Sequence, residues 1–469
     1  MKTIKYLMMG ALMLSFSAPV MAQDNKAIIQ QATQAIKAGA NKEVVKQLYK
    51  DNKKNAEVLV GIGRAFLNQN DTANAKMFAQ YANQRDGKYA PAYILLGDIC
   101  VRQDNGGGAA GWYQQAKYFD PKNPEAYYKY ANILRGRSPQ DAVDNLNELR
   151  VQRPDVAVDA LCARIWYRSN RLDKCMEYYD KVEQGKLEDE DITNYAMAGY
   201  LTQQRDKSLQ TALYGLSRDP RKAGWNRLVF YNYTDMDKFD DALTYANRLF
   251  NASDSAKISG YDYTYLGTAN MGKKNFDAAI EAFTKAIEAN GENKDLQNNN
   301  KKNLSDAYLA KEDYANAIKY YEEYLANNSQ PTASDLAGLG TVYQQQASGL
   351  TGTAQTEAFK KADGVYQQLG EKFPANIDFA NFMRARINSY MDPDTKQGLA
   401  KPFYEALANS LGSNANRDNT DNIRLTEAYR YLGYYYLLNN DKATADSYWN
   451  KVLAIDPENE TAKQALGIK

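Results

Sequence analysis

The sequence predicts an all-α protein, a solenoid of about eleven antiparallel helix pairs. Pairs of small residues 12 positions apart recur along the chain, and a fixed period of about 34 residues is typical of helical repeat arrays. Short polar segments that favour turns separate the two members of each pair. Proline is scarce, at 12 of 469 residues, whereas Ala, Lys and Leu are frequent, which favours helices.

Each expected repeat has a first helix, a short polar turn such as residues 439–442, and a second helix. A small residue on each helix allows the two axes to approach closely where they cross. A large side chain at either position would separate them. The pairs are Gly63 with Ala75, Gly97 with Ala109, Gly267 with Ala279, Ser305 with Ala317, and Gly433 with Ala445.

Large side chains beside each small pair complete the predicted core. They recur at spacings of three and four residues, which places them on one face of a helix. Many of the 37 tyrosines fall on such positions, where a ring with a polar tip packs between helices. In the last repeat they are Tyr429, Leu432, Tyr436, Trp449 and Val452, and Pro457 ends the unit.

This pattern resembles the tetratricopeptide repeat family, in which a large aromatic, Leu-Gly, Tyr, Ala, a second aromatic, Ala and Pro follow in order. The resemblance covers most of residues 55–460 and implies a right-handed superhelical solenoid. Weaker copies lie between three good ones. The good copies are Tyr93, Leu96, Gly97, Ala109, Tyr113, Ala116 and Pro121; Tyr263, Leu266, Gly267, Ala279, Phe283 and Ala286; and Tyr429, Leu432, Gly433, Tyr436, Ala445, Trp449, Val452 and Pro457.

The repeats divide the chain into segments with different expected roles. A solenoid needs a cap at each end of its core. The expected segments are a signal peptide (1–22), an N-terminal helical cap (23–54), an N-terminal repeat array (55–252), a C-terminal array (253–456) and a C-terminal capping helix (457–469). Irregular insertions are expected at about 345–360, as a longer turn, and at about 390–402.

The first 22 residues are typical of a secretion signal. Lys2 and Lys5 precede a short apolar run, and small residues allow cleavage after Ala22. The run is too short for a comfortable membrane span; an uncleaved anchor is the alternative. We therefore predict an exported, periplasmic protein with no membrane span after signal cleavage.

Composition excludes several function classes. The 58 basic residues balance 57 acidic ones, so nucleic acid is not expected as a partner, because phosphate binding needs a basic excess. The chain has no histidine, which removes Ser-His-Asp and Cys-His catalysis and the commonest zinc ligand. We expect no enzyme activity, no cofactor and no metal site. A paired-carboxylate enzyme stays open only if two carboxylates face each other within residues 377–410.

The family resemblance implies that the first helices line an inner groove that binds peptide segments of partner proteins. Six arginines fall on the groove positions, and arginine pairs with carboxylates and stacks on rings. An acidic or C-terminal peptide segment is therefore the expected ligand; solvated arginines on a helix face are the alternative. The candidates are Arg64, Arg102, Tyr128, Asn132, Arg135, Arg164, Tyr167, Arg168, Arg227 and Tyr231.

Only pieces of the family's Lys and Asn carboxylate clamp are present. Asn132 occupies the Asn position, but Tyr128 replaces the Lys. Lys302 fits the Lys position, but Asp306 replaces the Asn. The resemblance therefore does not extend to the clamp as a whole.

Three further features invite interpretation. The glycine-rich stretch 106–111 follows a helix, so we interpret it as a turn rather than a phosphate loop. Cys162 and Cys175 lie on the two helices of one unit; they form either a disulfide or two buried thiols. Cys100 is expected to be a buried thiol, and residues 298–303 to open a helix.

These observations favour a non-enzymatic protein-interaction scaffold that takes part in an envelope complex. The alternative is a glycan-binding protein on the same repeat scaffold, of the nutrient-capture type. That alternative needs aromatic rings that are exposed outside the repeat core, and Trp112 and Trp225 are its candidates.

Overall fold

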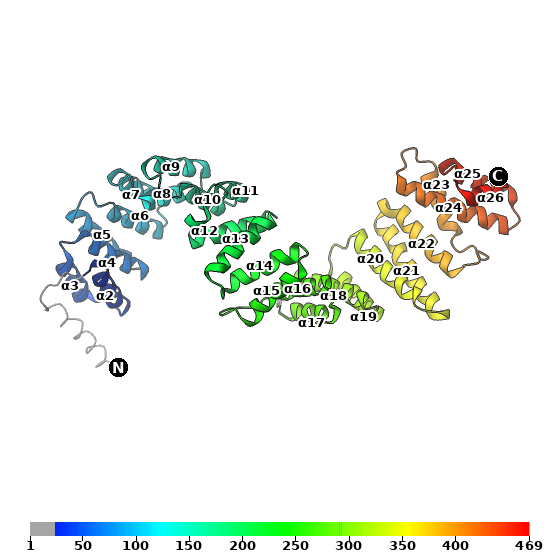
Figure 1. Cartoon of the computed structure of the whole chain (residues 1–469), viewed down its shortest axis with the longest axis horizontal. Helices are drawn as coiled ribbons and strands as arrows, with labels where there is room; N and C mark the ends of the chain where they lie inside the picture. Colours follow the sequence, from blue (N-terminus) through cyan, green and yellow to red (C-terminus); the bar gives the residue numbers. More distant parts are fainter. Residues whose placement is uncertain (1–23, 290, 292, 469) are drawn as a thin grey trace. The chain divides into compact units, whose positions relative to one another are not determined.

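The computed structural model describes residues 24–289, 291 and 293–468. The expected signal peptide lies outside these residues. Every regular element of the described chain is a helix, apart from one isolated bridge between Lys222 and Asp254, so the all-α repeat solenoid is confirmed. The chain divides into two compact units, residues 1–219 and 220–469, which are described separately (Figure 1). The expected division into two arrays at residue 252 stays a prediction.

Unit 1 holds the helices α2 to α13. They are α2 (Asn25–Lys37), α3 (Lys42–Asn52), α4 (Ala56–Asn68), α5 (Thr72–Arg85), α6 (Ala90–Arg102), α7 (Gly106–Phe119), α8 (Pro124–Leu134), α9 (Pro139–Gln152), α10 (Val158–Arg168), α11 (Leu172–Tyr179), α12 (Asp189–Leu201) and α13 (Arg205–Arg218), with a 3₁₀ turn at Gln184–Lys186.

Unit 2 holds the helices α14 to α26. They are α14 (Ala223–Asp235), α15 (Phe239–Asn251), α16 (Gly260–Gly272), α17 (Phe276–Ala289), α18 (Lys294–Ala310), α19 (Tyr314–Asn327), α20 (Ala333–Ser348), α21 (Gly352–Lys372), α22 (Ile377–Met391), α23 (Lys401–Gly412), α24 (Asn419–Leu438), α25 (Lys442–Ile455) and α26 (Glu460–Leu466), with a 3₁₀ turn at Pro374–Asn376.

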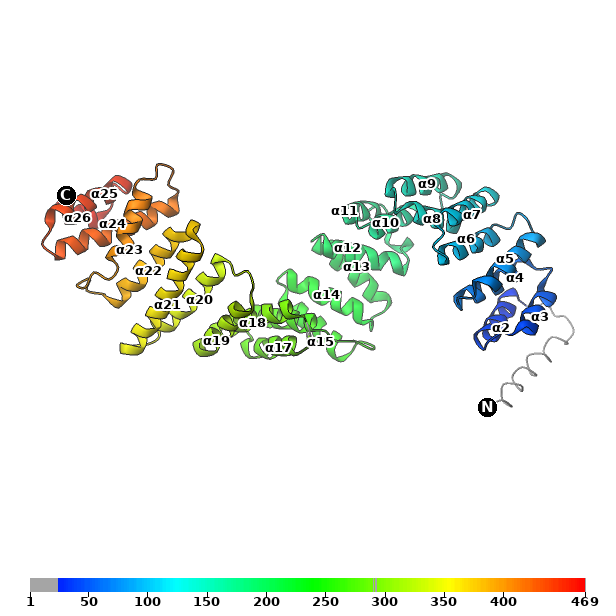
Figure 2. The ribbon, with the colours of Figure 1, turned by 180° about the vertical axis from the view of Figure 1, so that it is seen from behind.

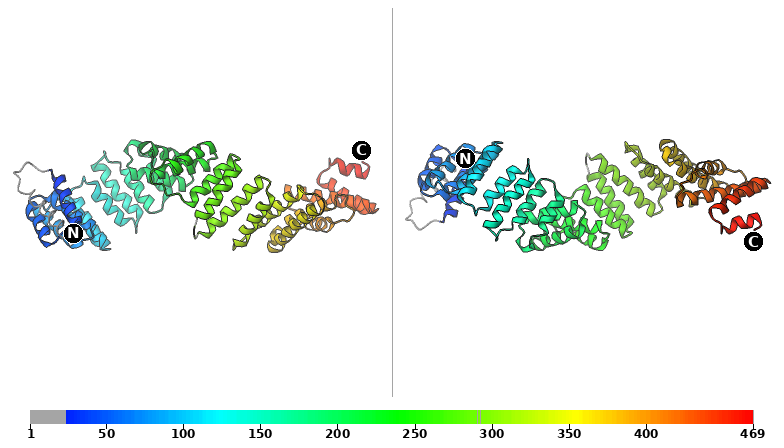
Figure 3. Two further views of the ribbon diagram at one scale, coloured as in Figure 1. Left: turned by 90° about the horizontal axis from the view of Figure 1, so that it is seen from below. Right: turned by 90° about the horizontal axis from the view of Figure 1, so that it is seen from above.

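From α4 to α25 the described helices form eleven consecutive pairs, each packed against its neighbours within a unit. Figures 2 and 3 show this succession of pairs from three further sides. α2 and α3 precede the first pair, and α26 packs against the last. No helix of the described residues is long and apolar enough to cross a membrane.

The turn between first and second helix follows one design in most pairs. Its middle residue adopts a left-handed backbone, and the next N–H bonds back to a carbonyl five residues earlier, as from Asp71 to Phe66 at 3.0 Å. This geometry satisfies the carbonyls at the helix end. The side chain of Asp71 then caps the second helix by accepting from the Asn74 N–H. Three residues therefore suffice to reverse the chain.

Three glycines of the small pairs, Gly97, Gly267 and Gly433, lie beneath aromatic rings of the second helix. A Cβ at Gly433 would lie 2.7 Å from Cε2 of Trp449, and one at Gly267 would lie 2.3 Å from the Phe283 ring. In these three pairs the ring belongs to the residue four positions after the small alanine. Where the glycine is replaced by Ser305, its hydroxyl donates to the Ala317 carbonyl at 2.6 Å. Each small residue thus makes room for close helix packing.

Three local predictions were wrong. The glycine-rich stretch 106–111 forms the start of α7, because the Asn105 side chain caps it and Ala109 and Tyr113 bury its inner face. The extra residues at 345–360 lengthen α20 and α21, and only three residues, 349–351, join them.

The polar stretch 298–303 lies inside α18 rather than at its start. Its buried asparagines hold neighbouring elements together. Asn298 donates to the Tyr324 carbonyl at 3.0 Å, and Asn300 lies 3.0 Å from the Thr264 hydroxyl. A partner on another helix therefore satisfies one polar atom of each of these amides.

Replacing Gly433 by alanine should lower the unfolding free energy of the protein by about 1–3 kcal/mol, because the new methyl group overlaps the buried Trp449 ring. Gly364→Ala is the matched control: it lies in α21, where nothing is within 4 Å of the new Cβ, so it should stabilise by about 0.5–1 kcal/mol. Urea unfolding measures both. Equal signs for the two variants would contradict the packing described above.

Candidate functional site

Most of the predicted groove arginines are already bonded to other parts of the fold. Arg64 of α4 pairs with Glu125 of α8 at 3.2 Å, and Arg168 of α10 with Glu190 of α12 at 2.8 Å. Arg135, just after α8, donates to the Arg168 carbonyl at 3.0 Å. The carboxylates therefore balance the charges of Arg64 and Arg168, and the carbonyl occupies the Arg135 guanidinium.

Arg164 is the most deeply bound of the set. It is 7% exposed, and its Nε and Nη2 donate to both oxygens of Asp191 at 2.6 and 2.8 Å. Asp191 is fully buried, accepts from the Tyr179 hydroxyl at 3.1 Å and accepts the Glu188 N–H at the start of α12. This bidentate pair fastens α10 to α12.

The same arrangement recurs at four junctions, and we call it the junction clasp. A cation on the first helix of one pair binds a carboxylate on the first helix of the next, and a tyrosine hydroxyl donates to that carboxylate. Cation nitrogen to oxygen distances are 2.6–3.1 Å. The clasps are Arg164–Asp191–Tyr179, Arg227–Asp262–Tyr231, Lys302–Asp335–Tyr324 and Arg386–Glu427–Tyr404.

Three of the clasp carboxylates, Asp191, Asp262 and Asp335, are the third residue of their helix and also accept the N-cap N–H. Burial acts to raise the pKa of Asp262, but hydrogen bonds from Arg227 and Ser259 outweigh burial and lower it. The same opposition lowers the pKa of Asp335 to about 2. Both side chains are therefore held as carboxylates.

The structure brings together another part of the predicted site around Tyr128. The guanidinium carbons of Arg164 and Arg168 lie 5.7 and 5.6 Å from the centre of its ring, and Arg168 also donates to Asn132 at 3.3 Å. Tyr167 is half-buried, and burial raises its pKa. Arg102 of α6 is exposed, and no carboxylate of the described residues pairs with it.

The two cysteines and two tryptophans singled out from the sequence are buried or half-buried in the fold. Cys162 and Cys175 are free, fully buried thiols whose pKa burial raises to about 12. Trp225 is 6% exposed, and Trp112 is half-buried beside Tyr93 at a ring separation of 6.0 Å. Neither tryptophan offers the exposed ring that the glycan alternative needs.

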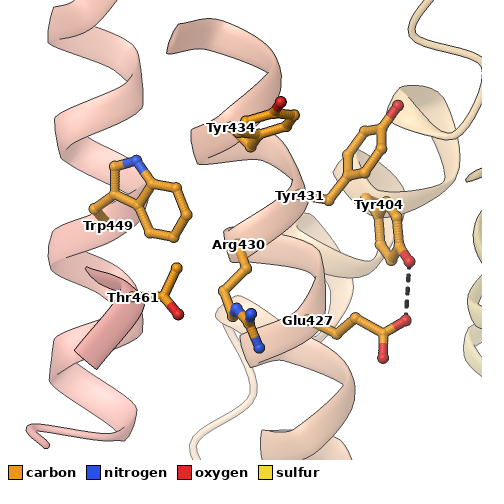
Figure 4. A pocket seen from close by; sticks show the side chains of 7 residues that line it. All are labelled: Tyr404, Glu427, Arg430, Tyr431, Tyr434, Trp449 and Thr461. Carbon is orange, nitrogen blue, oxygen red and sulfur yellow. Dashed lines mark hydrogen bonds between the residues drawn. The ribbon is translucent and has the colours of Figure 1, made fainter. Parts of the chain in front are cut away.

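An open cleft in unit 2 was missed by the sequence interpretation. Its volume is about 390 Å³, and it lies between α23, α24, α25 and α26. Tyr404 and Trp449 form buried walls, whereas Arg430 and Tyr434 are exposed (Figure 4). The lining residues are Tyr404, Glu427, Arg430, Tyr431, Tyr434, Trp449 and Thr461.

A second hollow, of about 400 Å³, shares Tyr434 with this cleft and continues along α24 to Leu438 and the loop 393–396. Tyr434, Leu437 and Leu438 are 44–46% exposed. Their spacing of three and four residues places them on one face of α24. We call Arg430, Tyr434, Leu437 and Leu438 the α24 surface.

The described residues contain no group of three or more metal-binding side chains. In the irregular stretch 377–410, the buried Asp392 carboxylate accepts the backbone N–H groups of Gln397 and Gly398 at 3.0 and 2.7 Å. It holds the loop after α22 in place.

The tetratricopeptide repeat family model matches residues 266–331, which span α16 to α19. The other nine described pairs have the same paired-helix geometry. This chain is a tetratricopeptide repeat protein. Repeats of this family generally serve as scaffolds that present extended binding surfaces.

Several solved structures are similar to this chain, and two of the three that follow are of tetratricopeptide repeat proteins. The C-terminal part of one from Cytophaga hutchinsonii is 26% identical, with a TM-score of 0.49, and the match covers 58% of this chain and 98% of that one. One from Parabacteroides merdae is 19% identical (TM-score 0.32; 54% and 98% covered). PilF of Pseudomonas aeruginosa is 12% identical (TM-score 0.31; 50% and 90% covered). No curated protein matches the chain.

Replacing Arg164 by alanine in this repeat protein should lower the unfolding free energy by about 3–5 kcal/mol, because Asp191 stays buried without its cation. Arg102→Ala removes the same charge from an exposed arginine and should change stability by less than about 0.5 kcal/mol. Urea unfolding compares them. Similar losses for both variants would show that Arg164 is not a fastening residue.

The clasp of Asp335 should make unit 2 sensitive to acid. Its folded pKa of about 2 lies below its ordinary value of 3.8, so the stabilisation is complete above about pH 4 and disappears as the pH falls to about 2. The loss should amount to about 2 kcal/mol, given about 1.4 kcal/mol for each pKa unit. Urea unfolding of the wild type and of Asp335→Asn across this range tests it; parallel pH profiles would contradict it.

Proposed function

We propose that this tetratricopeptide repeat protein is a non-enzymatic scaffold that binds a segment of a partner protein on the α24 surface. The supporting observation is the combination of a cleft with a row of exposed apolar side chains on one first helix. Exposed apolar residues scattered singly are normal, whereas a contiguous row beside a cleft marks an interaction site.

The main contact is in unit 2, because most arginines of the expected groove in unit 1 form ion pairs or hydrogen bonds within the chain. Arg102 is the exception, and it offers an exposed cation for an acidic segment. The groove candidates of unit 1 are accordingly proposed as a secondary contact of the same partner class.

We further propose that the protein works in the cell envelope as part of a larger complex. This rests on the N-terminal pattern of basic start, apolar run and small residues before Gln23. An exported scaffold needs no cofactor of its own, in keeping with a sequence that contains no histidine.

A photo-crosslinking amino acid at Leu438 should capture a discrete partner in cells that naturally make the protein. The same group at Val151, an 81% exposed apolar position on α9 of unit 1, is the matched control and should not capture it. Adding Leu437→Asp should remove the product at Leu438, because a carboxylate placed in the apolar row disfavours burial against a partner.

Identical products from positions 438 and 151 would argue against a specific surface on α24. The absence of any product from position 438, with the variant folded as judged by its helical circular dichroism, would argue against the binding role itself.

A further inference from the structure

Arg430 of α24 occupies the same repeat position as two cations of unit 2 that form ion pairs with the next helix pair. Arg227, Lys302 and Arg430 each lie 15 residues before the small alanine of their repeat. Arg227 binds Asp262 on α16, and Lys302 binds Asp335 on α20. These two cations therefore reach toward the first residues of the following first helix.

The junction after α24 lacks the carboxylate that Arg227 and Lys302 meet at theirs. Asp262 and Asp335 are the third residues of their helices, but the third residue of α26 is Ala462. Thr461, directly before it, lines the same cleft as Arg430, and Figure 4 shows the two side chains on opposite sides of that cleft. No carboxylate of the described chain forms an ion pair with Arg430, which is exposed.

Glu427 does not take the missing role, although it lines the cleft. Its two oxygens accept from Arg386 at 2.8 and 2.6 Å, and one also accepts from the Tyr404 hydroxyl at 2.9 Å. Its charge is thus balanced by Arg386, and the cleft keeps the unbalanced positive charge of Arg430.

Arg430 and Tyr434 are arranged in sequence like Arg227 and Tyr231, which bind the Asp262 carboxylate. On α14, Arg227 and Tyr231 are four residues apart, and together they bind Asp262 at 2.6 Å, 3.0 Å and 2.9 Å. On α24, Arg430 and Tyr434 occupy the same two repeat positions. Four residues is about one helical turn, so the two side chains share a face.

We propose that Arg430 and Tyr434 form an open junction clasp that binds an aspartate side chain of the partner segment. The inference rests on the proposed binding role of the α24 surface and specifies its ligand. The aspartate takes the place that Asp262 has between α14 and α16: the guanidinium binds the carboxylate and the Tyr434 hydroxyl donates to it. Charge-assisted bonds of this kind are about twice as strong as neutral ones.

The walls of the cleft define what flanks that aspartate. Tyr404 and Trp449 are buried aromatic surfaces, and Leu437 and Leu438 extend the apolar row away from Arg430. The volume of about 390 Å³ lies near the lower end of the range for ligand sites, roughly 300–1,000 Å³. It therefore suits one or two side chains, and an aspartate beside an aromatic or aliphatic residue fits.

The chain itself supplies the probe, since residues 258–264 (Ile-Ser-Gly-Tyr-Asp-Tyr-Thr) contain the aspartate that fills the equivalent site. A fluorescent, C-terminally amidated copy of this peptide should bind the purified protein in an anisotropy titration. Its Asp→Asn copy should bind at least tenfold more weakly. In Arg430→Gln the two peptides should bind alike, because the cation that distinguishes them is gone.

Lys442→Gln is the matched control: it removes one exposed positive charge from the adjacent α25, outside the cleft, and should keep the tenfold discrimination. Tyr434→Phe removes only the hydroxyl and should reduce discrimination without abolishing binding. Both residues are exposed, so these variants should fold.

Equal binding of the Asp and Asn peptides to the wild type, or binding of neither at low-millimolar concentration, would overturn the inference. A third peptide carries Asn in place of Asp and ends in a free carboxylate. If it binds as tightly as the Asp peptide, the site prefers a chain end, which overturns the aspartate assignment. A partner captured at Leu438 with no Asp discrimination would leave the scaffold role standing and remove only the open clasp.

Discussion

The stacking of this protein depends on carboxylates that are buried where one helix pair meets the next. Burying an unpaired carboxylate is strongly unfavourable, so each must meet a cation, a hydroxyl and a backbone N–H in one place. Asp191 and Asp262, both fully buried, satisfy this only when the preceding first helix is correctly placed. Apolar packing is attractive but not directional. The clasps, by contrast, are satisfied only at one relative placement of the two first helices.

The sequence predicted the part of the fold that depends on short spacings. The small residues, the rings four positions after the alanines and the polar turns all act within one repeat, so a pattern of about 34 residues reveals them. The misjudged elements are those where packing overrides local propensity. α7 begins in a run of glycines because Ala109 and Tyr113 are buried beneath it, and α18 tolerates buried asparagines because Tyr324 and Thr264 bond to them.

The candidate site was less predictable, because its meaning depends on partners far away in sequence. Arg164 and Arg430 are both arginines on first helices, but only Arg164 was among the predicted groove residues. Their difference lies 27 residues downstream of Arg164, at Asp191, and in the alanine at position 462. Sequence analysis could have found this signal only by asking which acidic residue each arginine meets in the next repeat.

The ion pairs of the predicted groove arginines show that a row of arginines need not make a basic surface. A row of arginines along a groove suggests a basic surface, yet most of those cations stabilise the array and are neutralised by it. The cation that indicates a binding site is one that forms no ion pair within the described chain. Arg430 stands in a clasp position without its carboxylate, beside exposed apolar side chains that the core does not need. Side chains that contribute little to the stability of their own chain are available for binding. At Arg430, a partner can supply the carboxylate that the fold does not provide.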